Sequence, residues 1–181
     1  MGTGVVSATA RRPGRARLAA QDRLLARIAE LHHIRCLLEE TTVLVERGWV
    51  QNAWVAVRDA RGQQHDLTAH QMHLAAGRPV SGVCLVGGLV LAAGGPPAVH
   101  TQLVQRTLDL MWHSLHEEVR RPVRWCPPPA VRAAHVRDLT RWNDAPMRTP
   151  GDVVALLGSA VLVADTEIGA RRAGLGAVAA R

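Results

Sequence analysis

The sequence predicts a mainly α-helical fold, a compact bundle of about five helices with one short β or extended segment near residues 49–58. Apolar residues recur at helical spacing over long stretches, and Gly and Pro punctuate those stretches. The chain has 181 residues and is 48% hydrophobic, which suits one domain with a core. We therefore expect a single helical domain over residues 18–165, a disordered basic tail at 1–17 and a flexible basic tail at 166–181.

The first predicted helix ends before Gly48, a residue that suits the position after a helix C-terminus. Its apolar stripe comprises Leu24, Ile28, Leu31, Leu38 and Val45. Such a helix would be about 45 Å long, whereas a small domain is only about 30 Å across. Either the helix breaks near His32 and His33, or one end projects and packs on a partner.

Two short elements and a buried helix are predicted in the middle of the chain. Thr68 is placed to cap a short helix that Gly77 ends. Ser81 is then expected to cap a nearly all-apolar segment, and the lack of a polar face predicts a helix buried on all sides. Gly87 and Gly88 lower the helix propensity of this segment, but they allow another part of the backbone to come close.

The C-terminal half predicts three further helices. A regular apolar stripe indicates a helix over 99–119, and a short amphipathic pattern indicates another over 130–142. Thr149 is a helix cap, with Pro150 in the first turn and Asp152 completing an arrangement close to a capping box. The last helix is expected to end near Ala164.

The positive charge lies at the two ends of the chain. The formal net charge is +7, and all 22 basic residues are Arg. Residues 1–18 contain four Arg, including Arg11 and Arg12, and no acidic residue, whereas the central part of the chain is nearly neutral. These tails indicate non-specific binding to nucleic acid or to an acidic protein surface. The alternative is that they are solvated, disordered ends.

Three Cys without paired spacing argue against a disulfide scaffold and favour a reducing, cytoplasmic setting. No secretory signal is visible. The strongest apolar run, at 83–93, is about half of what a membrane span requires, so no membrane association is expected. No cofactor is indicated.

Three fragments together resemble a known family. They are Gly48-Trp49-Val50-Gln51, Cys84-Leu85-Val86-Gly87-Gly88, and Trp142-Asn143-Asp144 followed by Arg148-Thr149. In this order they are similar to the G-W-x-Q, C-x-x-G-A and W-N-D-x-x-x-R-T motifs of the domain-of-unknown-function family 6197, uncharacterised small bacterial and phage proteins. Gly88 departs from the family's usual Ala. The likeness spans about residues 24–165 and implies domain limits, but no activity.

Cys84 is the candidate nucleophile. Near the N-terminus of its predicted helix a thiol pKa would be lowered, and a His with Asn143 and Asp144 would complete a thiol hydrolase. The alternative is a small, buried, apolar side chain, because apolar burial raises a thiol pKa.

Two His pairs are candidate metal ligands. His113 and His116 lie one helical turn apart, with Asp109 on the same polar face. His70 and His73 repeat this spacing on a short helix. The alternative for both pairs is a solvated polar face, because neither has the spacing of a known zinc module.

The stretch from Trp142 to Thr149 is the most distinctive polar segment. Asn143 and Asp144 can fix a turn between the last two helices, while Arg148 can pair with Asp144 or with a ligand anion. A capped connection and a binding site are therefore both open.

Arg137 and Arg141 are neighbours on one helix face, within the one basic stretch inside the domain. They would either extend a nucleic-acid footprint or offset acidic patches elsewhere.

Three functions remain open. We favour a non-enzymatic binding or assembly protein, phage-related in setting, that contacts nucleic acid or a protein partner through its Arg-rich tails. The alternatives are a small cysteine- or metal-dependent hydrolase centred on Cys84 and a His, and a structural subunit that forms a homo-oligomer through its long first helix.

Overall fold

The structure is a computed structural model, and it describes residues 13–117, 121–125 and 128–179. Within these ranges the fold is mainly helical, as the sequence predicts. Five α-helices and two short 3-10 helices accompany a small three-stranded antiparallel sheet. In chain order the elements are α1 (Pro13–Arg47), β1 (Val55–Arg58), β2 (Gln64–Leu67), η1 (Ala69–Ala75), β3 (Val80–Val83), α2 (Leu85–Ala92), η2 (Pro96–His100), α3 (Gln102–His116), α4 (Pro129–Asn143) and α5 (Pro150–Ala179).

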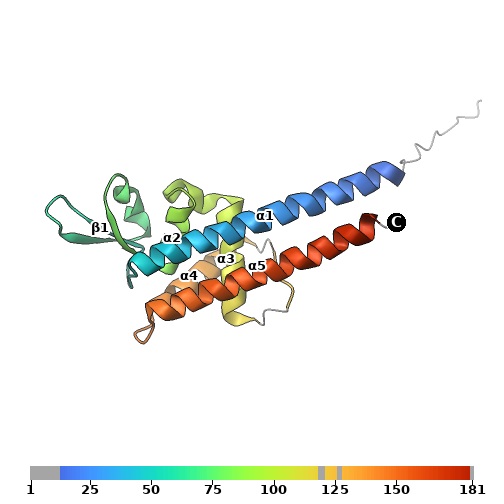
Figure 1. Cartoon of the computed structure of the whole chain (residues 1–181). Helices are drawn as coiled ribbons and strands as arrows, with labels where there is room; N and C mark the ends of the chain where they lie inside the picture. Colours follow the sequence, from blue (N-terminus) through green and yellow to red (C-terminus); the bar gives the residue numbers. More distant parts are fainter. Residues whose placement is uncertain (1–12, 118–120, 126–127, 180–181) are drawn as a thin grey trace, which may run out of the picture.

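Helix α1 runs without a break and lies antiparallel to α5 (Figure 1). No kink occurs at His32 and His33, because the neighbouring Leu31 and Ile34 are both fully buried and continue the apolar stripe. The Arg35 guanidinium lies 3.6 Å from the Asp165 carboxylate, and Arg172 Nη2 lies 3.3 Å from His32 Nε2. Of the two possibilities for this long helix, the structure therefore has the projecting one.

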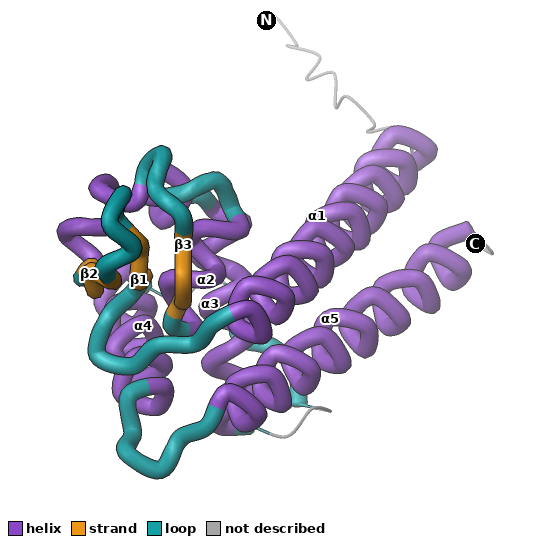
Figure 2. Tube along the Cα trace, turned by 60° about the vertical axis from the view of Figure 1, so that its left-hand side comes forward, coloured by secondary structure: helices purple, strands orange, loops and turns teal. Residues whose placement is uncertain are grey.

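The projecting ends of the two helices form what we call the arm, residues 13–26 of α1 and 169–179 of α5 (Figures 1 and 2). At the base of the arm, the Arg27 guanidinium lies 4.4 Å from the centre of the Trp125 ring. The last helix thus continues well past Ala164, and residues 166–179, expected to be a flexible tail, are helical. Residues 1–12, with Arg11 and Arg12, lie outside the described residues.

The sheet has the strand order β2-β1-β3, and it lies beside the helices at the end opposite the arm (Figure 2). The segment expected near 49–58 contains β1. Strand β3 occupies the position where a helix cap was expected at Ser81, because Val83 pairs with Val55 and Gly82 with Ala56. Helix α2 consequently begins later, after Cys84.

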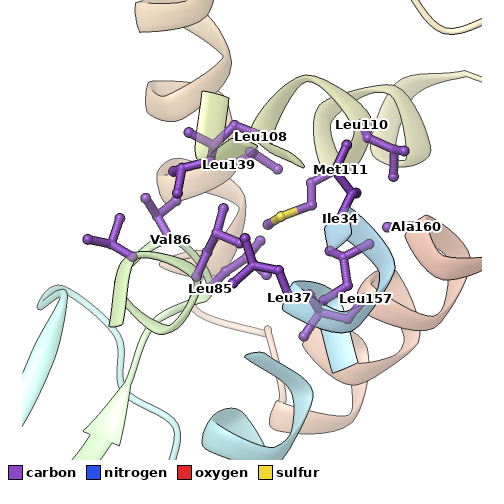
Figure 3. Packing of buried hydrophobic residues seen from close by; sticks show 14 of the residues in the cluster. Ile34, Leu37, Leu85, Val86, Leu108, Leu110, Met111, Leu139, Leu157 and Ala160 are labelled. Carbon is purple, nitrogen blue, oxygen red and sulfur yellow. The ribbon is translucent and has the colours of Figure 1, made fainter. Parts of the chain in front are cut away.

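Helix α2 is the centre of the core. Leu85 through Val90 are all buried, as the absence of a polar face predicts. Leu85 and Val86 belong to one hydrophobic cluster that also includes Leu108 and Met111 of α3, Leu139 of α4, Ile34 and Leu37 of α1, and Leu157 and Ala160 of α5 (Figure 3). A Cβ atom on Gly87 would lie 1.9 Å from the Trp54 carbonyl oxygen, so the expected close backbone approach is confirmed at Gly87.

The predicted caps are largely confirmed. Thr149 N donates to Asp152 Oδ2 at 2.9 Å, and Asp152 N donates to Thr149 Oγ1 at 3.2 Å, which is a capping box at the start of α5. Thr68 caps the 3-10 helix η1 in the same way. The stripe over 99–119 begins later as a helix, because Thr101 caps α3 and residues 96–100 form η2.

By length and composition, α5 would suffice to cross a membrane over Pro150–Ala177. The expectation that no stretch reaches this length is therefore wrong. A core helix of a soluble protein passes the same test, and α5 buries Val153, Leu157 and Ala160 completely.

Candidate functional site

The three motif fragments come together at the side chain of Asn143, the last residue of α4 and fully buried. Asn143 Oδ1 accepts hydrogen bonds from Trp49 Nε1 at 2.9 Å and from Leu85 N at 3.1 Å. Asn143 Nδ2 donates to Val50 O at 3.1 Å and to Asp144 Oδ1 at 2.8 Å. One amide therefore ties the end of α1, the start of α2 and the end of α4 together; we call this the motif junction.

Flanking residues extend the motif junction. Gln51 Nε2 donates to Asn143 O at 3.1 Å and to Ala145 O at 2.8 Å. Asp144 Oδ1 accepts from Asn52 N at 2.9 Å. A Cβ atom on Gly48 would lie 2.1 Å from the Ser81 carbonyl oxygen, so only Gly fits there. The distinctive residues of these motifs thus hold the backbone together.

Arg148 is also used inside the connection between α4 and α5. Its guanidinium lies 3.9 Å from the centre of the Trp142 ring, and its Nε donates to Trp142 O at 3.2 Å. It also lies 3.8 Å from the Asp152 carboxylate, and not against Asp144 as the sequence suggested. Of the two interpretations of this segment, the capped connection accounts for every contact it makes among the described residues.

Cys84 is buried at the N-cap of α2, where its Sγ accepts a hydrogen bond from Gly87 N at 3.2 Å. Burial raises the pKa of the Cys84 thiol to about 12, although the backbone hydrogen bonds from Gly87 and Val86 oppose this. Of the two interpretations of Cys84, the small buried side chain agrees with this raised pKa, because desolvation outweighs the effect of the helix N-terminus. Cys84 is a protonated, inaccessible thiol, beside Asn143 and Asp144 but without a His contact among the described residues.

The His pairs separate in the structure. Asp109 and His113 line one cavity, but His116 is exposed and packs its ring 4.6 Å from that of Trp112. His70 and His73 are both exposed on η1, where His73 Nδ1 lies 3.0 Å from His70 O. Within the described ranges there is no group of three or more His, Cys, Asp or Glu side chains that would hold a metal ion.

The cavity has a volume of about 250 Å³ and lies between α3 and α4. Buried Asp109 accepts from His135 Nδ1 and from Arg132 Nη2, both at 3.3 Å. Burial raises the pKa of Asp109, against the opposing effects of Arg132 and His135. The sequence analysis missed His135; its position four residues before Leu139, on the buried face of α4, was the available signal.

Trp112 connects this cluster to the rest of α4. Its ring stacks on that of His135, with ring centres 4.2 Å apart and planes at 15°, and its Nε1 donates to Asp138 Oδ2 at 3.2 Å. His113 is 5% exposed, and its Nε2 is buried without a hydrogen-bond partner. The cavity thus contains an oriented imidazole, His135, and an unsatisfied one, His113.

Arg137 and Arg141 are exposed on α4, in the body and not on the arm. The arm carries the described part of the basic residues near the two ends of the chain, while Arg11, Arg12 and Arg181 lie outside the described residues. Arg15 and Arg23 of α1 and Arg172 of α5 are exposed there.

Comparisons with known proteins identify the family to which this chain belongs. Neither the curated proteins nor the solved structures contain a match to this chain. The sequence model described as a family of unknown function, DUF6197, matches residues 30–161. That range includes the motif junction and the described residues around the cavity, and it excludes the arm. The family resemblance read from the three motifs is therefore confirmed, and the chain belongs to the family of unknown function DUF6197.

Proposed function

We propose that this chain is a non-enzymatic binding protein whose arm contacts a polyanion, with nucleic acid as the favoured partner. The body matched by the family is the scaffold that holds the arm. The observation that carries the proposal is the meeting of the two Arg-rich ends of the sequence on one two-helix projection (Figure 1).

The charge on the arm is mainly positive. Its α1 part contains Arg15, Arg17 and Arg23 against Asp22, and its α5 part contains Arg172 and also Arg171, which pairs with Glu167 at the base of the arm. Pairing of the two helices places the α5 cations alongside α1, since Arg172 Nη2 lies 3.3 Å from His32 Nε2, and the α1 cations lie further out on the same projection. A clustered set of cations binds phosphate backbones with an affinity that falls steeply with salt.

A protein partner is the second candidate, because the arm also exposes apolar side chains. Leu18 is 61% exposed and Leu25 is 48% exposed, and their spacing of seven places them on one face of α1. The corresponding test is light scattering: a larger assembly would support this candidate, and a monomer at all concentrations would exclude a homo-oligomer.

The polyanion proposal is tested by measuring binding to a labelled duplex and to single-stranded RNA over a range of salt concentrations. The variant R15A/R23A/R172A removes three exposed cations from the arm. It should weaken binding and reduce the salt slope for the duplex by up to about 3.

The matched control is R58A/R61A/R78A, which removes three exposed cations from the sheet end of the molecule. Both triple variants change the net charge equally, so only the location differs. Equal losses in the two variants would overturn the arm as the binding element, and no binding by the unaltered protein would overturn the proposal as a whole.

A further inference from the structure

The cavity between α3 and α4 is built like a site for a small molecule, independently of the arm. Trp112, Pro122 and Val131 supply apolar walls, while His113 and His135 supply polar atoms. A cavity of about 150 Å³ is sufficient for benzene. The volume of about 250 Å³ therefore admits one aromatic ring with a polar substituent.

The polar atoms of this cavity are arranged for a ligand. The His135 ring is held in place by the 3.3 Å contact between its Nδ1 and Asp109 Oδ1 and by stacking on Trp112. His113 Nε2 is buried with no partner among the described residues. An unsatisfied buried nitrogen costs about 1–3 kcal/mol, and a ligand that hydrogen-bonds to it would recover that cost.

The charges at the cavity indicate the sign of the ligand. Asp109 is paired with Arg132 and His135, and Glu117 is paired with Arg121 at 3.0 Å. Arg124 also lines the cavity, is exposed, and pairs with no acidic side chain of the described residues. Among the described lining residues, Arg124 is therefore the side chain whose positive charge no acidic partner offsets.

We propose that this cavity binds a small aromatic carboxylate. The ring lies between the apolar walls, the carboxylate pairs with Arg124, and His113 Nε2 hydrogen-bonds to a polar atom of the ligand. The apolar walls favour an organic acid over inorganic phosphate, which has no apolar part to bury. This site lies in the part of the chain that the family model matches, so it belongs to the body and not to the arm.

The test is a titration with benzoate, followed through the ring signals of His113 and His135 by NMR. We expect both sets of signals to shift, with a Kd on the order of 1 mM for so small a ligand. Benzamide, the neutral isostere, and inorganic phosphate should each bind at least about tenfold more weakly.

Two variants make the test specific. R124Q removes the exposed cation and should weaken benzoate binding by about tenfold, whereas R78Q, an exposed cation outside the cavity, should leave it unchanged. V131W fills the cavity from its rim and should abolish the shifts. Unshifted His113 and His135 signals, equal affinity for benzamide or phosphate, or full affinity in R124Q would each overturn the proposal.

Discussion

The motif junction and the cavity both involve helix α4, but they differ in whether their buried polar atoms are hydrogen-bonded. At the motif junction, both polar atoms of the buried Asn143 side chain have two hydrogen-bond partners each. At the cavity, the Nε2 atom of buried His113 has none among the described residues. A buried polar cluster whose hydrogen bonds are all made stabilises a fold. A buried polar atom without a hydrogen bond lowers the stability, so its presence needs an explanation such as binding of a ligand.

The two regions also differ in how they look in the sequence. The motif junction consists of the most distinctive residues, such as Trp49 and Asn143, yet the side-chain amide of Asn143 is fully used by hydrogen bonds within the fold. The cavity consists of residues without a recognisable motif. In this protein the distinctive sequence motifs therefore indicate a structural role, and the polar atom without a partner lies at the cavity.

The largest effect is expected from N143A at the motif junction. It leaves Leu85 N, Trp49 Nε1 and Val50 O without their partner in a buried place. The free energy of unfolding should fall by about 3–5 kcal/mol in chemical denaturation. The control Q64A alters an exposed side chain and should stay within about 0.5 kcal/mol. A loss of less than about 1 kcal/mol in N143A would contradict the assigned role.

The next largest effect is expected from G87A in α2. Its new Cβ would lie 1.9 Å from the Trp54 carbonyl oxygen, and backbone must move to make room. The loss should be about 2–3 kcal/mol or more. G158A in α5 meets nothing within 4 Å and should instead stabilise the protein by about 0.5–1 kcal/mol. Thermal unfolding of the two variants compares them directly, and a shift of the same sign in both would refute the close approach.

A smaller effect of opposite sign is expected from H113L at the cavity. It removes the unpartnered Nε2 while keeping an apolar side chain of similar size, so the free energy of unfolding should rise by about 1 kcal/mol. H116L, at an exposed position one turn further on, should change little. If H113L proves destabilising, His113 makes a contact that the fold needs, and the contrast with Asn143 fails.

The smallest effect is expected from D152N in the capping box of α5. Backbone and side-chain hydrogen bonds from Thr149 hold the pKa of Asp152 below its usual value of 3.8. A carboxylate with a lowered folded pKa contributes stability above the unfolded pKa, and this contribution is lost as the pH falls through the folded pKa. The difference between D152N and the unaltered protein should therefore be present near about pH 7 and shrink below pH 3.8. A difference that persists unchanged in acid would show that the charge contributes nothing.

Much of the fold follows from local pattern. The apolar stripes of α1 and α3, the burial of α2 and the capping box at Thr149 are confirmed, because each depends on residues within a few turns of one another. Strands β2 and β3 were missed, since each has only four residues and β2 reads QHDL, without an apolar alternation. The helical continuation to Ala179 was missed because its Ala- and Gly-rich sequence is held by pairing with α1, which no local pattern reveals.

The candidate sites were predictable only in part. The three motifs were recognised as belonging together, but their hydrogen bonds join residues 58 to 94 positions apart, so their convergence on Asn143 required the structure. Asp109 and His113 were singled out as metal ligands, whereas their actual neighbours, Arg132 and His135, come from α4 and pair the carboxylate with cations. The burial of Cys84 likewise depends on the packing of α2 at the centre of the core.

The antiparallel pairing of α1 with α5 also constrains how the chain reaches its native state. Helix α1 leaves the ribosome early, and the part of its apolar stripe that packs on α5 stays uncovered until α5 has been synthesised. The amide of Asn143 meets its partners late for the same reason. Contacts between residues far apart in sequence slow folding, so this protein should fold more slowly than a helical bundle with local contacts of the same size. During that interval the α5-facing side of α1 exposes apolar surface of the kind that makes incompletely folded chains prone to aggregate.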